Sequence, residues 1–189
     1  LSALWFVFLA RLIAESTTCA LYGGGGFLTG SLGGWMAAHM STFVLINLES
    51  GSFSGFPRGD FDIAMDADLP DTGEYTAEKM ISGRYLGQLC MYTLKGAAAE
   101  GLFSENASAI IGKMTEVVTP TIDKWGSGRF PKGFSSEDRV NLVYIINELF
   151  ERSARCIACK LCGILEVTGA GVDKRACIAV DGSLFTASK

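Results

Sequence analysis

Residues 42–51 read TFVLINLESG, and this stretch is the clearest indication of the fold in the sequence. A run of mostly β-branched and apolar residues at 42–48 has the length of a buried strand, and the polar sequence Glu49-Ser50-Gly51 bounds it. A second strand is predicted at 175–180, before the turn sequence Asp181-Gly182-Ser183. Helical patterns separate the two strands, so the sequence predicts an α/β domain with at least a partly parallel sheet.

Three helices are predicted between these strands. Apolar residues trace one face from 76 to 96, where Thr76 is a plausible N-cap, and a second helix is predicted around 104–118. The third helix, at 135–166, begins with a cap and two acidic residues, and its length predicts a break or bend near 148–155. Residues 54–74 carry six acidic side chains among turn residues and are predicted to form a solvated acidic loop rather than a calcium site.

Composition narrows the class of protein. A chain of 189 residues with 49% hydrophobic and 19% charged residues has the size of one domain, and a net charge of -4 makes a nucleic-acid surface improbable. The apolar run at 1–10 is too short to span a bilayer. Residues 3–14 are interpreted as a buried element of an internal piece of a domain, and a signal peptide or membrane anchor is the less favoured alternative. The chain has six cysteines, and their spacing favours reduced thiols and a cytoplasmic location over a disulfide framework.

Three of the cysteines form the C-x2-C-x2-C motif Cys156, Cys159 and Cys162. This spacing begins some iron–sulfur ligand runs, but a fourth cysteine at the expected distance is missing. We therefore interpret these residues as small hydrophobic side chains of a buried helix, and an iron–sulfur module stays the less favoured alternative. The single histidine, His39, excludes a histidine-based triad or a zinc site with several histidines within this chain.

Two carboxylates lie where ligands often bind in open α/β folds. Glu49 ends the strand at 42–48, and Glu78 opens the helix at 76–96. An ionised carboxylate only accepts hydrogen bonds, which suits it to substrate hydroxyls. From the pattern alone, the alternative is that both are acidic residues of the surface without a role in ligand binding.

Four segments in order resemble the hexokinase and glucokinase family. The sequence from Asn47 to Phe53 is similar to the N-x-E-x-G-x-F segment of the family, and Glu78–Gly87 reads EKMISGRYLG, nearly as in its animal and fungal members. Arg152, Ala154 and Ala158 resemble the R-x-A-x-x-x-A helix of the family, and 180–185 resembles its V-D-G-S-[LV]-[YF] turn. The resemblance covers about residues 42–185, whereas residues 1–40 match poorly.

The resemblance implies a fold, a reaction and a set of residues. The fold would be the RNase H-like large domain of actin/hexokinase-type ATPases, a mixed sheet with helices, of which residues 1–189 form an incomplete C-terminal part. The reaction would be ATP-dependent phosphorylation of a hexose such as glucose at its 6-hydroxyl, with Mg²⁺ as cofactor. Glu49 and Glu78 fall on the two carboxylates of the family that accept hydrogen bonds from the sugar.

The phosphate segment departs from the pattern of the family. Where the family has G-T-G-x-N-x-x-Y, residues 15–22 read ESTTCALY, so Glu15 and Thr17 replace glycines and Cys19 holds the sugar-binding asparagine position. Ser16 and Thr17 are the candidate nucleotide contacts, and the general-base aspartate is expected upstream of Leu1. Because Glu15 brings negative charge toward the phosphates of ATP, a non-catalytic sugar-binding or interaction protein of the same fold is the alternative function.

Overall fold

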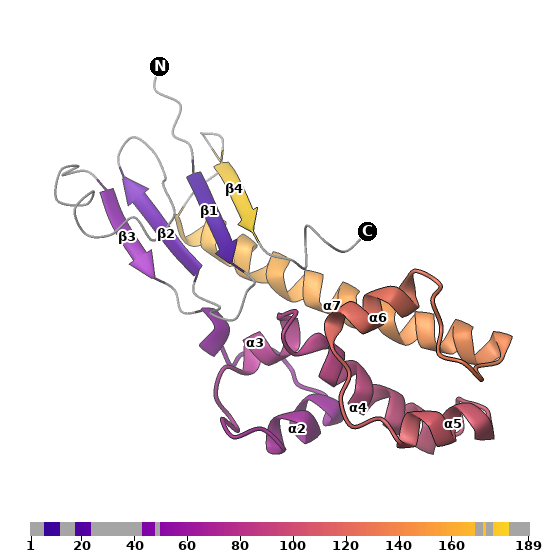
Figure 1. Cartoon of the computed structure of the whole chain (residues 1–189). Helices are drawn as coiled ribbons and strands as arrows, with labels where there is room; N and C mark the ends of the chain where they lie inside the picture. Colours follow the sequence, from indigo (N-terminus) through magenta and orange to yellow (C-terminus); the bar gives the residue numbers. More distant parts are fainter. Residues whose placement is uncertain are drawn as a thin grey trace.

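The structure is a computed structural model that describes residues 6–11, 18–23, 43–47, 50–168, 172 and 176–181. It has a sheet at one end and a cluster of helices at the other, and the long helix α7 (Ser136–Thr168) extends from the cluster toward the strands (Figure 1).

The sheet has four strands in the order β3-β2-β1-β4. These are β1 (Phe6–Arg11), β2 (Thr18–Gly23), β3 (Phe43–Asn47) and β4 (Ala176–Asp181). β2 pairs antiparallel with both β1 and β3, whereas β1 and β4 are parallel. Strands β3 and β4 lie at the positions that the sequence predicts, and the parallel pair joins segments from opposite ends of the chain.

The predicted acidic loop at 54–74 is wrong in its middle part. After the short 3-10 helix η1 (Ser50–Ser52), residues Asp60–Ala67 form helix α2, in which Asp62 and Asp66 are buried. Asp62 caps this helix, because its Oδ2 accepts a hydrogen bond of 2.8 Å from the backbone N–H of Gly59. Both carboxylates also form ion pairs with basic side chains outside α2. The sequence pattern within 54–74 does not indicate these partners, and it therefore predicted solvated carboxylates.

The helix predicted at 76–96 is two helices, α3 (Thr76–Ile81) and α4 (Leu86–Ala99). Ser82 is extended, with φ -78° and ψ 140°, and its hydroxyl accepts a hydrogen bond of 3.1 Å from the backbone N–H of Arg84. This local bond competes with the helical ladder and turns the chain between the two helices. Thr76 does not cap α3 either: its hydroxyl donates to the Phe53 carbonyl at 3.2 Å.

The remaining helices differ from the prediction in their ends. α5 (Glu105–Gly112) is shorter than the predicted 104–118, and α6 (Thr119–Gly126), which begins with a proline in its first turn, was not predicted. α7 is continuous, so the predicted break near 148–155 is wrong. The polar residues there bond to other elements from an intact helix: Arg152 pairs with Asp62, and the Ser153 hydroxyl donates to the Ile81 carbonyl.

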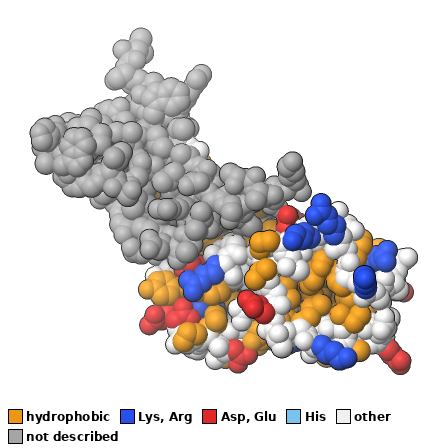
Figure 2. Space-filling model, viewed as in Figure 1, with side chains coloured by type: hydrophobic (Ala, Val, Ile, Leu, Met, Phe, Trp, Pro, Cys, Tyr) orange, Lys and Arg blue, Asp and Glu red, His pale blue; other side chains and the backbone are white. Residues whose placement is uncertain are grey.

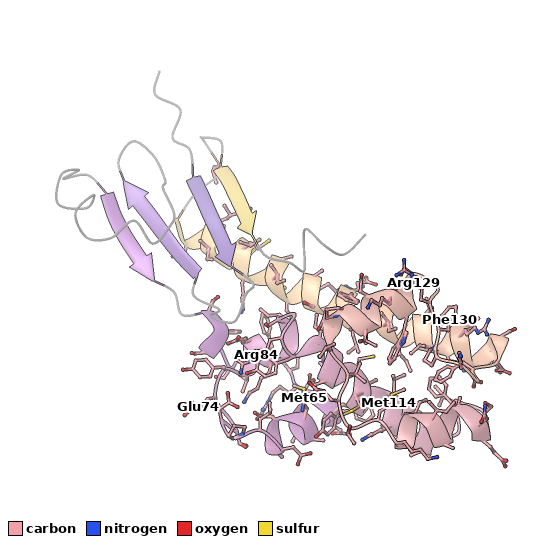
Figure 3. All side chains as sticks on the ribbon, in the orientation of Figure 1. Met65, Glu74, Arg84, Met114, Arg129 and Phe130 are labelled. Atoms are coloured by element: carbon pink, nitrogen blue, oxygen red, sulfur yellow. The ribbon has the colours of Figure 1, made fainter. Side chains whose placement is uncertain are left out.

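A large hydrophobic core holds most of the helical part together. Its fully buried side chains come from α2, α4, α5, α6 and α7: Met65, Leu86, Leu89, Leu94, Ile111, Ile122, Leu142 and Ile146. Figure 3 shows Met65 inside this part of the molecule and Glu74 near its outer edge. The face seen in Figure 2 has hydrophobic side chains in its middle and charged ones mostly toward its margins. Within the described residues, every helix is too short or too polar to cross a membrane.

Candidate functional site

Glu78 lies in α3 and is buried, with 6% of its surface exposed. A six-residue helix is too short to be stable alone, so its neighbours must hold it. The Thr76 hydroxyl ties its first turn to the Phe53 carbonyl, and the Ser153 hydroxyl of α7 donates to the Ile81 carbonyl at 2.9 Å. Glu78 is thus a carboxylate at a fixed position between two anchored helix ends.

A buried ion-pair network fixes the other side of α3. The Lys79 ammonium donates to Asp66 Oδ1 at 2.7 Å and to the Asp71 carbonyl at 2.6 Å, while Arg58 reaches Asp66 Oδ2 at 2.8 Å. Burial alone would raise the pKa of Asp66, but its bonds to Lys79, Gly73 and Arg58 lower that pKa below its ordinary value. Burial likewise opposes the charge of Lys79, yet the bonds to the two aspartates raise its pKa. Both groups therefore stay charged near neutral pH and hold α2 against α3.

Lys160 of α7 reaches into the same region and was missed by the sequence reasoning. Its ammonium donates to the Ser50 carbonyl in η1 at 2.7 Å and lies 5.8 Å from the centre of the Phe56 ring. Burial lowers the pKa of Lys160 to about 8, although Cys156 and Glu78 act in the opposite direction. Because 110 residues separate Lys160 from Ser50, no local pattern could have indicated this contact.

The other candidate residues fall outside what the structure describes, or nearly so. Glu49, Ser16 and Thr17 lie outside the described residues, and only the backbone of Cys19 is described, in β2. Cys19 pairs with Leu9 of β1 and with Asn47, the last residue of β3. In the sequence, Glu49 falls between β3 and η1, and η1 packs against α3. η1, which follows β3 in the chain, thus lies against the helix that carries Glu78, and α2 comes between η1 and that helix in the sequence.

A separate cavity of about 370 Å³ lies between α2, α4 and α7, and Glu78 is not part of its lining. Asp62 and Arg152 form a two-bond pair in its wall, at 2.7 and 2.8 Å. Within the described part of the chain, the Nε atom of Arg152 is buried without a hydrogen-bond partner. The lining carries charges of both signs beside Phe61 and Leu89, so it gives no clear preference for one ligand.

The C-x2-C-x2-C motif lies in the C-terminal half of α7, and its side chains are less buried than predicted. Cys156 is half-buried, whereas Cys159 and Cys162 are exposed, and all three are free thiols. The interpretation of these cysteines as buried hydrophobic side chains is therefore wrong for Cys159 and Cys162.

Comparison with known proteins places these features in a family. The sequence model of the family described as hexokinase matches residues 29–189. Hexokinase-1 of Oryza sativa subsp. japonica is 30% identical over 173 residues, which is 77% of this chain and 34% of that protein. Hexokinase-2 of the same plant is 31% identical over 164 residues, or 75% of this chain and 33% of that protein. The chain thus spans about a third of the length of the curated relatives that it matches.

Solved structures share the fold. The hexokinase from Schistosoma mansoni complexed with glucose superposes with a TM-score of 0.65 at 20% identity, covering 94% of this chain and 42% of that chain. A second crystal structure of a hexokinase gives a TM-score of 0.60 at 21% identity, covering 97% of this chain and 40% of that chain. At these identities the likeness concerns the fold alone.

Proposed function

This chain belongs to the hexokinase family, and from that premise we propose that it is part of a sugar kinase that phosphorylates a hexose such as glucose at its 6-hydroxyl with MgATP. The observation that carries the proposal is the position of Glu78, a buried carboxylate on a helix anchored at both ends. The sequence around it, EKMISGRYLG at 78–87, resembles the family.

In this proposal Glu78 accepts hydrogen bonds from hydroxyl groups of the sugar. A rigid acceptor favours a ligand that has a hydroxyl at the matching place and rejects one without it, because the buried carboxylate would then lose its bond. Glu49 is proposed as the second acceptor, and Cys19 as the residue at the third sugar position. Acceptors on separate elements would fix the sugar ring and so position the 6-hydroxyl for attack.

The fold proposal follows the family. We assign residues 1–189 to part of an RNase H-like large domain of the actin/hexokinase type, with 42–185 as its family-like portion. The mixed sheet β3-β2-β1-β4 and the hexokinase structures of similar fold support this assignment. The free thiols of Cys90, Cys156, Cys159 and Cys162 support a cytoplasmic location.

The residues proposed to contact the nucleotide lie outside the described part of the chain. MgATP would supply the phosphoryl group, and phosphate loops bind it with free backbone N–H groups. Here residues 18–20 belong to β2, which lies between β1 and β3 and pairs with both. Ser16 and Thr17 remain the proposed nucleotide contacts.

A second candidate function is sugar binding without catalysis. The replacement of glycines by Glu15 and Thr17 favours it, because side chains at these positions oppose close approach of phosphate. This alternative keeps the role of Glu78 and removes the reaction.

One experiment separates the two functions. The native protein at its natural length is assayed for glucose 6-phosphate formation with MgATP, and glucose binding is measured on the same sample. We expect turnover that falls strongly in Glu78→Gln. Glucose binding without turnover would support the non-catalytic alternative, and a folded sample that shows neither would refute both functions.

A further inference from the structure

Lys160 is the feature near Glu78 that the family resemblance leaves unexplained. It joins three elements: its own helix α7, the 3-10 helix η1 through the 2.7 Å bond to the Ser50 carbonyl, and the 53–59 segment through the Phe56 ring. η1 packs against α3, and so does α7. Lys160 therefore lies where the elements around Glu78 meet.

Charge and burial show that this position is unfavourable for a lysine. The ammonium group gives up water here, and this loss of hydration lowers its pKa to about 8. An apolar side chain of similar length would avoid that loss. Residues that oppose stability in this way are common at functional sites, where their charge is used.

The charge of Lys160 acts on a small set of groups. Among the described residues, the titratable groups that influence it are Glu78 on α3 and Cys156 on its own helix. η1 presents a carbonyl oxygen to it, and the 53–59 segment presents an aromatic ring. The contacts with the carbonyl and the ring are strongest with the protonated amine, so loss of the proton weakens the link between α7, η1 and the 53–59 segment.

Building on the proposed function, we propose that Lys160 is a positioning residue for hexose binding, which holds η1 to α7 beside the helix that carries Glu78. It does not need to touch the sugar. Its bond to η1 supports the helix that carries the acceptor, so the affinity for hexose follows the protonation of this amine.

The test is glucose binding by calorimetry on the native protein between pH 6.5 and pH 9.5. In the unmodified protein we expect the affinity to fall about fivefold to tenfold as pH rises through 8, the range that separates a charge-assisted from a neutral hydrogen bond. Lys160→Arg keeps its charge over this range, so its profile should be flat. Lys160→Met should bind about tenfold more weakly at pH 7, with a flat profile and a melting temperature no lower than that of the unmodified protein.

Controls separate this inference from other causes. Cys156 also titrates above neutral pH, since burial raises its pKa, and Cys156→Ala should keep the profile of the unmodified protein. If Lys160→Met does not fold, the comparison with Lys160→Arg decides the question. Equal affinity and an equal pH profile in the Lys160 variants would overturn the inference while leaving the proposed function in place. Absence of glucose binding by the unmodified protein would overturn both.

Discussion

Gly87, the second residue of α4, is the position where one added methyl group should cost most. A Cβ atom there would lie 2.4 Å from the Val118 carbonyl carbon and 2.5 Å from both the Thr119 nitrogen and the Val117 oxygen. All three are backbone atoms, so no side-chain rotation relieves the contact. Gly87→Ala must therefore push the start of α6 away from α4.

The magnitude follows from two losses. Overpacking of this kind costs about 1–3 kcal/mol. The shift also strains a buried chain of hydrogen bonds, in which the Gly87 N–H donates to Thr119 Oγ1 at 3.0 Å and that hydroxyl donates to the Gly83 carbonyl at 2.5 Å. Breaking it leaves buried polar groups unpaired and costs about 1–3 kcal/mol more. After the gain of about 1 kcal/mol from helix propensity, we expect Gly87→Ala to lower the free energy of unfolding by about 3 kcal/mol.

Urea denaturation followed by circular dichroism measures this change, and Gly163→Ala is its matched control. Gly163 lies within α7, and a Cβ atom there meets nothing within 4 Å. The same substitution should therefore stabilise the protein by about 1 kcal/mol. If Gly87→Ala and Gly163→Ala change the free energy of unfolding by the same amount, the close approach of α4 to α6 in this structure is refuted.

Three further predictions concern charge and thiol reactivity. Burial would raise the pKa of Asp138, but hydrogen bonds from Ser104 and Ser135 lower that pKa from 3.8 to about 2. The ionised form of Asp138 therefore stabilises the fold above pH 4 by about 2 kcal/mol. That stability should be lost as pH falls from 4 to 2 in acid titrations of unfolding, and Asp138→Asn should lack this part of the pH dependence. Arg152→Met leaves Asp62 buried without its two-bond partner and should lower the free energy of unfolding by about 3 kcal/mol. Its control, Arg155→Met, removes an exposed pair with Glu151 and should change the free energy of unfolding by less than about 0.5 kcal/mol. Equal effects of the two substitutions in urea denaturation would contradict the buried pairing of Arg152 with Asp62. Iodoacetamide should label the exposed Cys159 and Cys162, as measured by mass spectrometry, and should leave Cys90 unlabelled. The reason is that burial raises the pKa of the Cys90 thiol to about 12. Rapid labelling of Cys90 would contradict its burial in α4.

The sequence was most informative where a signal is local. The strand at 42–48 and the strand at 175–180 each combine an apolar run with a turn signal, and β3 and β4 lie there. The start of α7 was predicted for a similar reason: the Ser135 hydroxyl accepts a hydrogen bond from the Asp138 N–H at 3.1 Å, as a helix cap does.

The errors arose where distant residues decide the structure. Asp62 looks solvated in sequence, but Arg152, 90 residues away, makes it a buried partner and stabilises α2. The periodicity of 76–96 predicts one helix because apolar residues remain in phase across Ser82, where the backbone nevertheless turns. Lys160 gives no signal at all, since its role depends on a contact with Ser50.

Glu78 itself was predicted from the resemblance, and the structure shows how it is held. Its helix is held by the Lys79–Asp66 pair on one side and by Ser153 on the other, and the motif around Glu78 includes neither Asp66 nor Ser153. The structure thus explains why this carboxylate is fixed, while its role toward a sugar remains our proposal.

Glucose binding by the native protein, measured by calorimetry with and without Glu78→Gln, tests the central claim most directly. Glutamine has nearly the same size but replaces the acceptor-only carboxylate, and we predict a loss of affinity of about 10- to 100-fold with an unchanged circular dichroism spectrum. Glu74→Gln is the matched control, because Glu74 is exposed and lies just before α3. This variant should bind glucose with the affinity of the unmodified protein. Unchanged glucose affinity in a folded Glu78→Gln variant would contradict the assignment of Glu78 to the sugar site.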